Sequence, residues 1–133
     1  MLTEKDYCDY ETCVALKELG YIGSSRYYYT QRDHKFHYDA YNKFYTVRTA
    51  DAMGYVLAVH LYDAQKWLRE EKDVIIVVCP YTYDIINKTH TWTCEIWFGD
   101  NLEYGIHNFK SYEEALSIGI MEVVEILKDG VGE

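Results

Sequence analysis

Two histidines in a short polar segment make the nearest approach to a metal-binding pattern in this chain. His34 and His37 are separated by two residues, and Asp33 and Asp39 lie beside them. Imidazole nitrogens and carboxylate oxygens are common ligands of divalent metals. On a strand or turn this spacing does not reliably bring two rings together, unlike the i, i+4 pair of a zinc-binding helix. A small metal-dependent enzyme with its site near these histidines is therefore one hypothesis, and a solvated polar turn is the interpretation that we favour.

The cysteines point less clearly to chemistry. None of the four belongs to a C-x-x-C pair: Cys8, Cys13, Cys79 and Cys94. The first two have no second close pair that would complete a zinc site. His90 or His107 could approach Cys94 across neighbouring strands, but Cys94 lies in an apolar run, where burial disfavours the reactive thiolate. Because the sequence also lacks a G-x-S-x-G elbow, a Gly-rich phosphate loop and an H-E-x-x-H motif, we predict no catalytic residue and no cofactor.

Tyrosine is unusually abundant, with fifteen residues in 133. A dense group between Tyr27 and Tyr45 is interleaved with basic residues, namely Arg26, Arg32, Lys35, Lys43 and Arg48. Tyrosine combines a rigid apolar ring with a polar tip, which suits protein-binding surfaces. Aromatic rings beside basic groups can also hold a single nucleic-acid strand. A third interpretation is a sheet whose inner tyrosines fill a small core.

The charge is distributed unevenly along the chain. The net charge is −9, but the segment 26–48 holds five basic residues against two aspartates, a net charge of +3. The rest of the chain therefore carries −12, which opposes long-range attraction to nucleic acid and favours a protein partner with a basic surface. No stretch approaches the apolar length of a membrane helix, and acidic residues near the N-terminus do not fit a signal peptide. We expect a cytoplasmic protein with no membrane partner.

Helix signals occur at both ends of the chain and in its middle. The stretch 12–19 has apolar residues at helical spacing, Asp9 can cap its start, and Gly20 is the expected stop. The stretch 62–71 also has helical periodicity. Ser111 and Glu114 form a capping box that begins a third helix, in which Ala115 and Gly119 permit close approach to a sheet.

Strand signals are strongest in the second half. The apolar run 74–79 is typical of a strand covered on both faces. The stretch 91–98 alternates between apolar and polar residues, with Trp97 breaking the polar face, and a turn at 99–101 leads into a strand at 102–109. Two or three further strands are expected in the tyrosine-rich segment. We predict a single α+β domain over 1–133, a two-layer sandwich with about three helices on one face of a mostly antiparallel sheet.

Three short stretches resemble sequences of one known family. These are LKELGY at 16–21, AQKWLRE at 64–70 and SYEEAL at 111–116. They occur in this order and at similar spacing in a family of small uncharacterised proteins carried by anaerobic gut bacteria, their phages and other mobile elements. In that family the helix around Trp67 usually opens after a Pro-Thr pair, whereas Val59-His60 stands here. The resemblance implies a mobile-element origin, and because the family has no established activity it assigns no functional residue.

The leading hypothesis is a non-enzymatic interaction protein of a phage or other mobile element that binds a host or sister protein through its tyrosine-rich surface. The predicted anchors are Tyr28, Tyr38, Tyr41 and Tyr45, with Arg32 as a polar partner. The alternatives are the metal-dependent enzyme near His34 and His37 and a single-stranded nucleic-acid binder acting through the segment 26–48.

Overall fold

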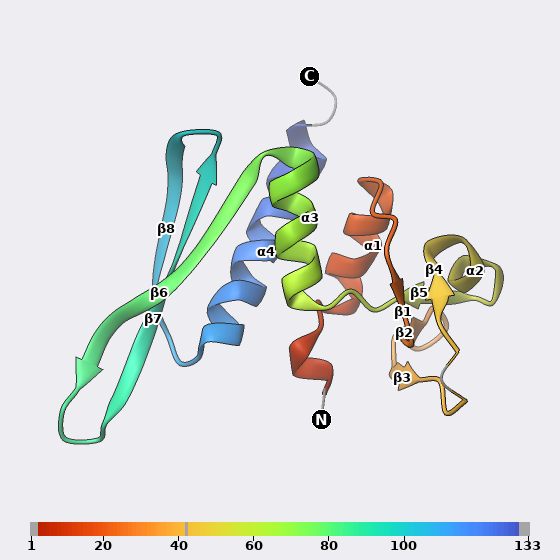
Figure 1. Cartoon of the computed structure of the whole chain (residues 1–133), viewed down its shortest axis with the longest axis horizontal. Coiled ribbons are helices and arrows are strands. Elements are labelled where there is room, and N and C mark those ends of the chain that lie inside the picture. The colour runs from red at the N-terminus through yellow and green to blue at the C-terminus, as the bar shows by residue number, and fades with distance from the viewer. Residues whose placement is uncertain (1–2, 42, 131–133) are drawn as a thin grey trace.

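Three helices lie side by side in the middle of the molecule, between a long sheet and a group of short strands (Figure 1). The computed structural model describes residues 3–41 and 43–130, without the side chains of residues 103 and 104. The central helices are α1 (Tyr10–Glu18), α3 (Leu61–Lys72) and α4 (Tyr112–Gly130). The long sheet has the order β6-β7-β8, with β6 at Val74–Asp84, β7 at Thr89–Phe98 and β8 at Asn101–Phe109. Its strand pairs are antiparallel, and α3 and α4 pack on it, which confirms an α+β sandwich.

The tyrosine-rich half of the chain forms two smaller antiparallel sheets. One has the order β3-β2-β5, from Phe36–Tyr38, Tyr27–Thr30 and Tyr55–Leu57. The other pairs β1 (Ser24–Ser25) with β4 (Tyr45–Thr46). The short helix α2 (Val47–Ala52) was not predicted; it begins where the Thr46 hydroxyl accepts a hydrogen bond from Thr49 N. A 3-10 turn, η1 (Glu4–Asp6), precedes α1.

Local capping signals set the helix ends as the sequence predicts. The Asp9 carboxylate accepts a hydrogen bond from Thr12 N at 2.8 Å, and Gly20 follows the helix with a φ of 105°. The Ser111 hydroxyl accepts from Glu114 N at 3.0 Å at the start of α4. Among the described hydrogen bonds, the reciprocal one from Ser111 N to the Glu114 carboxylate is not formed. Capping therefore rests on one side chain rather than on a pair.

Close contact between α4 and the long sheet depends on a glycine. Gly119 is fully packed against β6 and β7, and a Cβ placed there would overlap Sγ of Cys94 and lie 3.0 Å from Cγ2 of Ile76. Leu116, Ile120 and Cys94 are each 0 % exposed in the same layer. The prediction that Gly119 permits close approach to the sheet is confirmed.

The prediction that the run 74–79 is covered on both faces is wrong. The strand extends to Asp84, and only alternate residues are buried: Val74 and Ile76 are 1 % and 3 % exposed, whereas Ile75 and Val77 are 38 % and 37 % exposed. The physical reason is that α3 and α4 cover one face of the sheet, and no described segment covers the other. In the described part of the chain, no helix is long and apolar enough to cross a membrane.

Candidate functional site

The predicted tyrosine anchors separate into packed and exposed side chains. Tyr28 is half-buried, with its ring stacked 4.0 Å from that of Tyr55 and edge-on to Tyr45 at 5.5 Å. Tyr45 is only 5 % exposed, so its ring belongs to this aromatic cluster. In contrast, Tyr38 and Tyr41 are 60 % and 92 % exposed. The exposed part of the predicted site is therefore smaller than the sequence suggests.

One tyrosine of β2, next to Tyr28, belongs to the hydrophobic core. Tyr29 is 1 % exposed, and its phenol donates a hydrogen bond to the carbonyl of Cys8 at 2.7 Å. Burial raises the pKa of Tyr29 well above the usual value for tyrosine, because the ionised form would lose its hydration. Since side chains alternate along a strand, Tyr28 and Tyr29 face opposite sides of β2. Part of the tyrosine content thus fills the core, as one of the interpretations expected.

The two histidines of the possible metal site do not converge. The ring of His34 stacks on Tyr10 at 3.6 Å, whereas the ring of His37 stacks near Tyr28 at 5.6 Å. Asp39 accepts hydrogen bonds from the backbone N–H groups of Tyr41 and Lys43, so it acts as a turn residue. No cluster of three or more histidine, cysteine or acidic side chains suited to a metal occurs among the described residues.

The cysteines occupy apolar surroundings. Cys8 and Cys13 are buried neighbours, with the Cys13 thiol donating to the carbonyl of Cys8 at 3.5 Å. The Cys13 contact and burial raise the pKa of the Cys8 thiol well above its usual value. Burial likewise raises the pKa of Cys94 to about 11. Cys94 faces α4 at Gly119, whereas the His107 ring lies on the opposite face of the sheet, so the two do not form a catalytic pair.

The face of the long sheet turned away from the helices carries an apolar surface, which we call the open face. It consists of the outward side chains of three strands: Ile75, Val77, Cys79, Thr93, Glu95, Trp97, Leu102 and His107. Trp97 lies opposite both Ile75 and Leu102 in the strand register. This Trp97 is the residue that breaks the polar pattern of 91–98.

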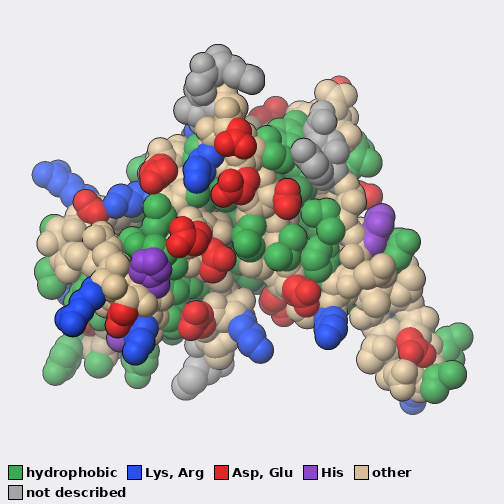
Figure 2. Space-filling view, turned by 180° about the vertical axis from the view of Figure 1, so that it is seen from behind, with side chains coloured by type: hydrophobic (Ala, Val, Ile, Leu, Met, Phe, Trp, Pro, Cys, Tyr) green, Lys and Arg blue, Asp and Glu red, His purple; other side chains and the backbone are tan. Residues whose placement is uncertain are grey.

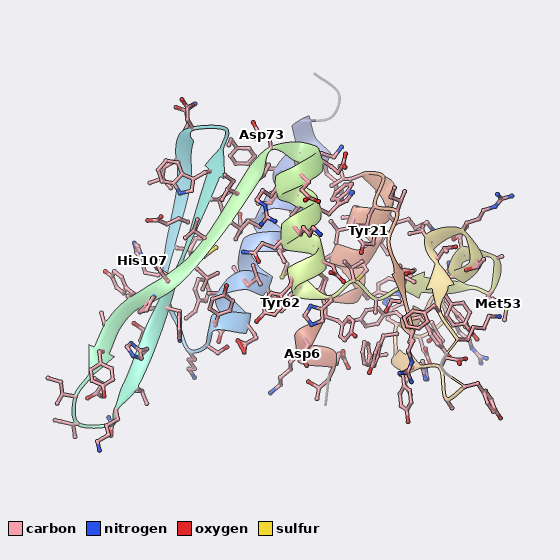
Figure 3. All side chains as sticks on the ribbon, viewed as in Figure 1. Asp6, Tyr21, Met53, Tyr62, Asp73 and His107 are labelled. Atoms are coloured by element: carbon pink, nitrogen blue, oxygen red, sulfur yellow. The ribbon has the colours of Figure 1, made fainter. Side chains whose placement is uncertain are left out.

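A hydrogen-bonded cluster closes one end of the open face. The Thr93 hydroxyl donates to the carbonyl of Ile106 at 2.8 Å and lies 2.7 Å from Nδ1 of His107. Because a hydroxyl has one proton, Nδ1 of His107 is then the donor to Thr93. The ring of Tyr81 stacks on His107 at 4.5 Å. Figure 3 shows His107 on the long sheet, at the opposite end of the molecule from Met53.

Beyond the open face, the hairpin of β6 and β7 extends away from the helices (Figure 1). We call its residues 80–90 the β-arm, and every one of them is exposed. At the tip, Ile85 and Ile86 are 79 % and 90 % exposed. The Asp84 carboxylate accepts hydrogen bonds from the N–H groups of Ile86 and Asn87, which orders the turn. Figure 2 shows this tip as a projection with hydrophobic side chains at its end.

The sequence prediction placed the helices on one face of the sheet, but it did not identify the other face or the β-arm as a candidate binding surface, although two signals for them exist. One signal is the apolar run 74–79, which needs cover on both faces and receives it on one. The other is the pair Ile85-Ile86 inside a turn, where polar residues are usual.

Comparison with protein-family models, with curated proteins and with solved structures gives no match for this chain.

Proposed function

We propose that this chain is a non-enzymatic interaction protein that binds another protein mainly through the open face and the β-arm. The observation that carries the proposal is the uncovered apolar side of a sheet whose other side is packed by helices. Ile75 and Val77 stand on it with more than a third of their surface exposed, and Trp97 lies beside them. An isolated two-stranded hairpin is only marginally stable in water, so the β-arm gains most from a partner that covers it.

The edges of the sheet are less suited to binding than its face. The Gln65 side chain of α3 donates a hydrogen bond to the carbonyl of Ile76 at 2.8 Å, so that edge-strand carbonyl is already satisfied. Pro80 lacks an N–H, and the register of β6 shifts beside it. On the other edge, β8 contains two register shifts, and Asn108 has a φ of 71°. Such irregularities hinder the addition of a further strand. The partner therefore docks on the face instead of extending the sheet.

Charge defines the chemistry of the partner. The segment 73–109, which forms the long sheet and its turns, holds one lysine and five acidic residues, a net charge of −4. An apolar surface within acidic surroundings fits a protein whose own apolar patch is bordered by lysine and arginine. A second copy of this chain fits less well, because two such faces would bring like charges together. The occupant we propose is a basic partner protein.

The tyrosine-rich segment supplies a second contact in this proposal, at the far end of the molecule. Of the predicted anchors and their polar partner, Tyr38, Tyr41 and Arg32 are exposed, whereas Tyr28 and Tyr45 pack against each other in the aromatic cluster. The resemblance to proteins of phages and mobile elements favours a host or sister protein as the partner.

The test compares variants of the two surfaces in a pull-down from lysate of the natural host, with and without nuclease. The face variant Ile75→Thr/Val77→Thr keeps strand propensity and removes apolar surface. The arm variant is Ile85→Ser/Ile86→Ser, and the tyrosine variant Tyr38→Ser/Tyr41→Ser removes aromatic surface at the second contact. The matched control Ile22→Ser/Met53→Ser removes exposed apolar surface that belongs to neither contact. A retained protein is then purified and titrated against each variant by calorimetry.

We expect one basic protein to remain bound after nuclease treatment. Its affinity for the face and arm variants should be lower by about tenfold or more, since each tenfold corresponds to about 1.4 kcal/mol of lost apolar burial. The tyrosine variant should lose a smaller part of the affinity, and the control should bind within a few-fold of the wild type. Equal binding by the wild type and the face variant would refute the assignment of the open face. Loss in the tyrosine variant alone would place the contact in the segment 26–48.

A second candidate function is binding of a single nucleic-acid strand. The observation in its favour is that Tyr41 and Phe44 are 92 % and 64 % exposed in the same segment as the exposed Arg32 and Arg48. Affinity for an oligonucleotide would then fall steeply with salt as condensed counterions are released. Flat salt dependence, or the absence of binding at low salt, would eliminate this function.

A further inference from the structure

A pocket of about 320 Å³ lies beside the strand pair β1–β4, away from the open face. Its polar lining comes from separate parts of the chain: Ser24, Ser25 and Arg26 from the start of the tyrosine-rich segment, and His60 and Asp63 from the start of α3. The aromatic part consists of Tyr7, Tyr27 and Phe44. The lining includes none of the side chains named for the proposed protein contact.

The guanidinium of Arg26 forms no ion pair with any described residue, although Asp63 lines the same pocket. Its Nη2 donates to the backbone carbonyl of Asp39 at 3.3 Å. Its Nε is buried and makes no hydrogen bond to any of the residues described, and it is the one side-chain nitrogen or oxygen among them in this condition. The described residues form two ion pairs, Lys17–Asp51 and Lys128–Glu125, and Arg26 belongs to neither of them. Because Nε has almost no accessible surface, an anion in the pocket would bind through the terminal nitrogens of the guanidinium. Its charge would offset the free-energy cost of a partly buried cation that has no ion-pair partner.

Further donors surround the same pocket. The Ser25 hydroxyl accepts a hydrogen bond from Tyr27 N at 2.9 Å, which leaves its own proton free to donate. Nδ1 of His60 accepts from Tyr62 N at 3.1 Å, so the neutral ring carries its proton on Nε2. With the hydroxyl of Ser24, the lining offers several neutral donors in addition to one cation. This combination is suited to an oxyanion, which has several acceptor sites and a negative charge.

The aromatic lining adds a second requirement for the ligand. The rings of Tyr7 and Tyr27 pack 4.8 Å apart, and the Phe44 ring is 64 % exposed beside them. An exposed ring at a pocket mouth can stack on a planar group of a ligand. Asp63, the one acid in the lining, can accept a hydrogen bond from a ligand hydroxyl or amine.

We propose that this pocket binds a small molecule that carries an oxyanion, either phosphate or carboxylate, on a planar ring. Arg26 holds the oxyanion, Ser24, Ser25 and His60 donate to it, and Phe44 covers the ring. The net charge of +3 over 26–48 attracts an anion to this part of an otherwise acidic protein.

The test is a titration of the whole chain, followed by NMR and calorimetry, with four probes at low ionic strength. The probes are inorganic phosphate, a nucleoside monophosphate, the corresponding nucleoside, and benzoate as the planar carboxylate. We expect saturable binding of an oxyanion on a ring, stronger than binding of phosphate alone, and little binding of the nucleoside. The ratio of the nucleoside monophosphate to benzoate identifies which oxyanion the pocket prefers.

Three variants distinguish binding in the pocket from general attraction of anions by the basic segment 26–48. Arg26→Lys keeps the charge but removes Nε and the guanidinium fork, and should weaken binding about tenfold or more. Phe44→Ala should lower the affinity for the ring-bearing ligand and leave the affinity for phosphate unchanged. Arg32→Ala, an exposed arginine of the same segment outside the pocket, is the control and should bind within about twofold of the wild type.

Thermal melts establish that each variant is folded. Should Arg26→Lys prove unfolded, Ser24→Ala replaces it, since Ser24 is exposed and outside the core. Absence of saturable binding by all four probes would overturn the proposal. Equal losses in Arg26→Lys and Arg32→Ala would do so as well, because they would show attraction by the basic segment instead of a pocket.

Discussion

Replacing Gly119 by alanine tests the packing of the helical layer on the long sheet. The added Cβ would overlap Sγ of Cys94 and meet Cγ2 of Ile76 at 3.0 Å. Both neighbours are buried, at 0 % and 3 % exposed, so neither can move into solvent. Overpacking of this kind costs about 1–3 kcal/mol. Alanine favours a helix over glycine by about 1 kcal/mol, which offsets part of that cost. Because the Cβ overlaps Sγ of Cys94 outright, the upper part of the overpacking range applies, about 2–3 kcal/mol. Subtracting the helix preference leaves an expected net loss of about 1–2 kcal/mol in the free energy of unfolding.

Urea unfolding followed by circular dichroism measures this loss, and the matched control is Gly130→Ala. Gly130 lies at the end of the same helix, where a Cβ would meet nothing within 4 Å. The control should therefore be neutral or slightly stabilising. The double variant Gly119→Ala/Cys94→Ala should lose less than the sum of the two single changes, because removal of Sγ relieves the overlap. If Gly119→Ala were as stable as Gly130→Ala, the close contact between α4 and β7 would be refuted.

Three further outcomes follow from burial, exposure and ionisation. Tyr29→Phe should lower the free energy of unfolding by about 1–2 kcal/mol, because the Cys8 carbonyl loses its donor, whereas Tyr38→Phe at an exposed site should not; urea titrations compare the two. The face variant Ile75→Thr/Val77→Thr should keep its melting temperature within a few degrees of the wild type and lose partner binding, and a large fall in melting temperature would contradict an uncovered face. The free energy of unfolding should fall as pH rises from about 10 to 12, because burial raises the pKa of Tyr21 from 10.0 to about 12. Over this range the Tyr21 phenol ionises in the unfolded chain before it ionises in the folded one. Unchanged urea midpoints would contradict a buried Tyr21.

Elements with short-range signals were predictable, and their boundaries show why. Asp9, Gly20 and Ser111 act on backbone groups within a few residues of themselves, so their roles follow from the local sequence. The alternation of 91–98 likewise predicted β7, with Cys94 and Ile96 buried on one side. The helix α2 was missed because its start depends on Thr46 within a tyrosine-rich stretch that favours strands.

The predicted binding residues divide into exposed and packed side chains, and the reason is strand geometry. Tyrosine content alone does not distinguish Tyr29, at 1 % exposed, from Tyr41, at 92 %. Which ring is buried depends on the face that a short strand presents to α1 and on the position of the following loop. The spacing of the histidine pair likewise does not predict where its rings lie, since His34 and His37 stack on tyrosines from different segments.

The sequence by itself determined the α+β class, the long helices, the strands of the second half and the close approach at Gly119, because these depend on periodicity and on neighbours along the chain. Only the tertiary structure decided which face of β6 is covered, which tyrosines are exposed and that Arg26 has no counter-ion in the described part of the chain. Each of these depends on whether a distant segment arrives to cover a group. An apolar run predicts a need for cover, but the arrangement of the helices determines which side receives it.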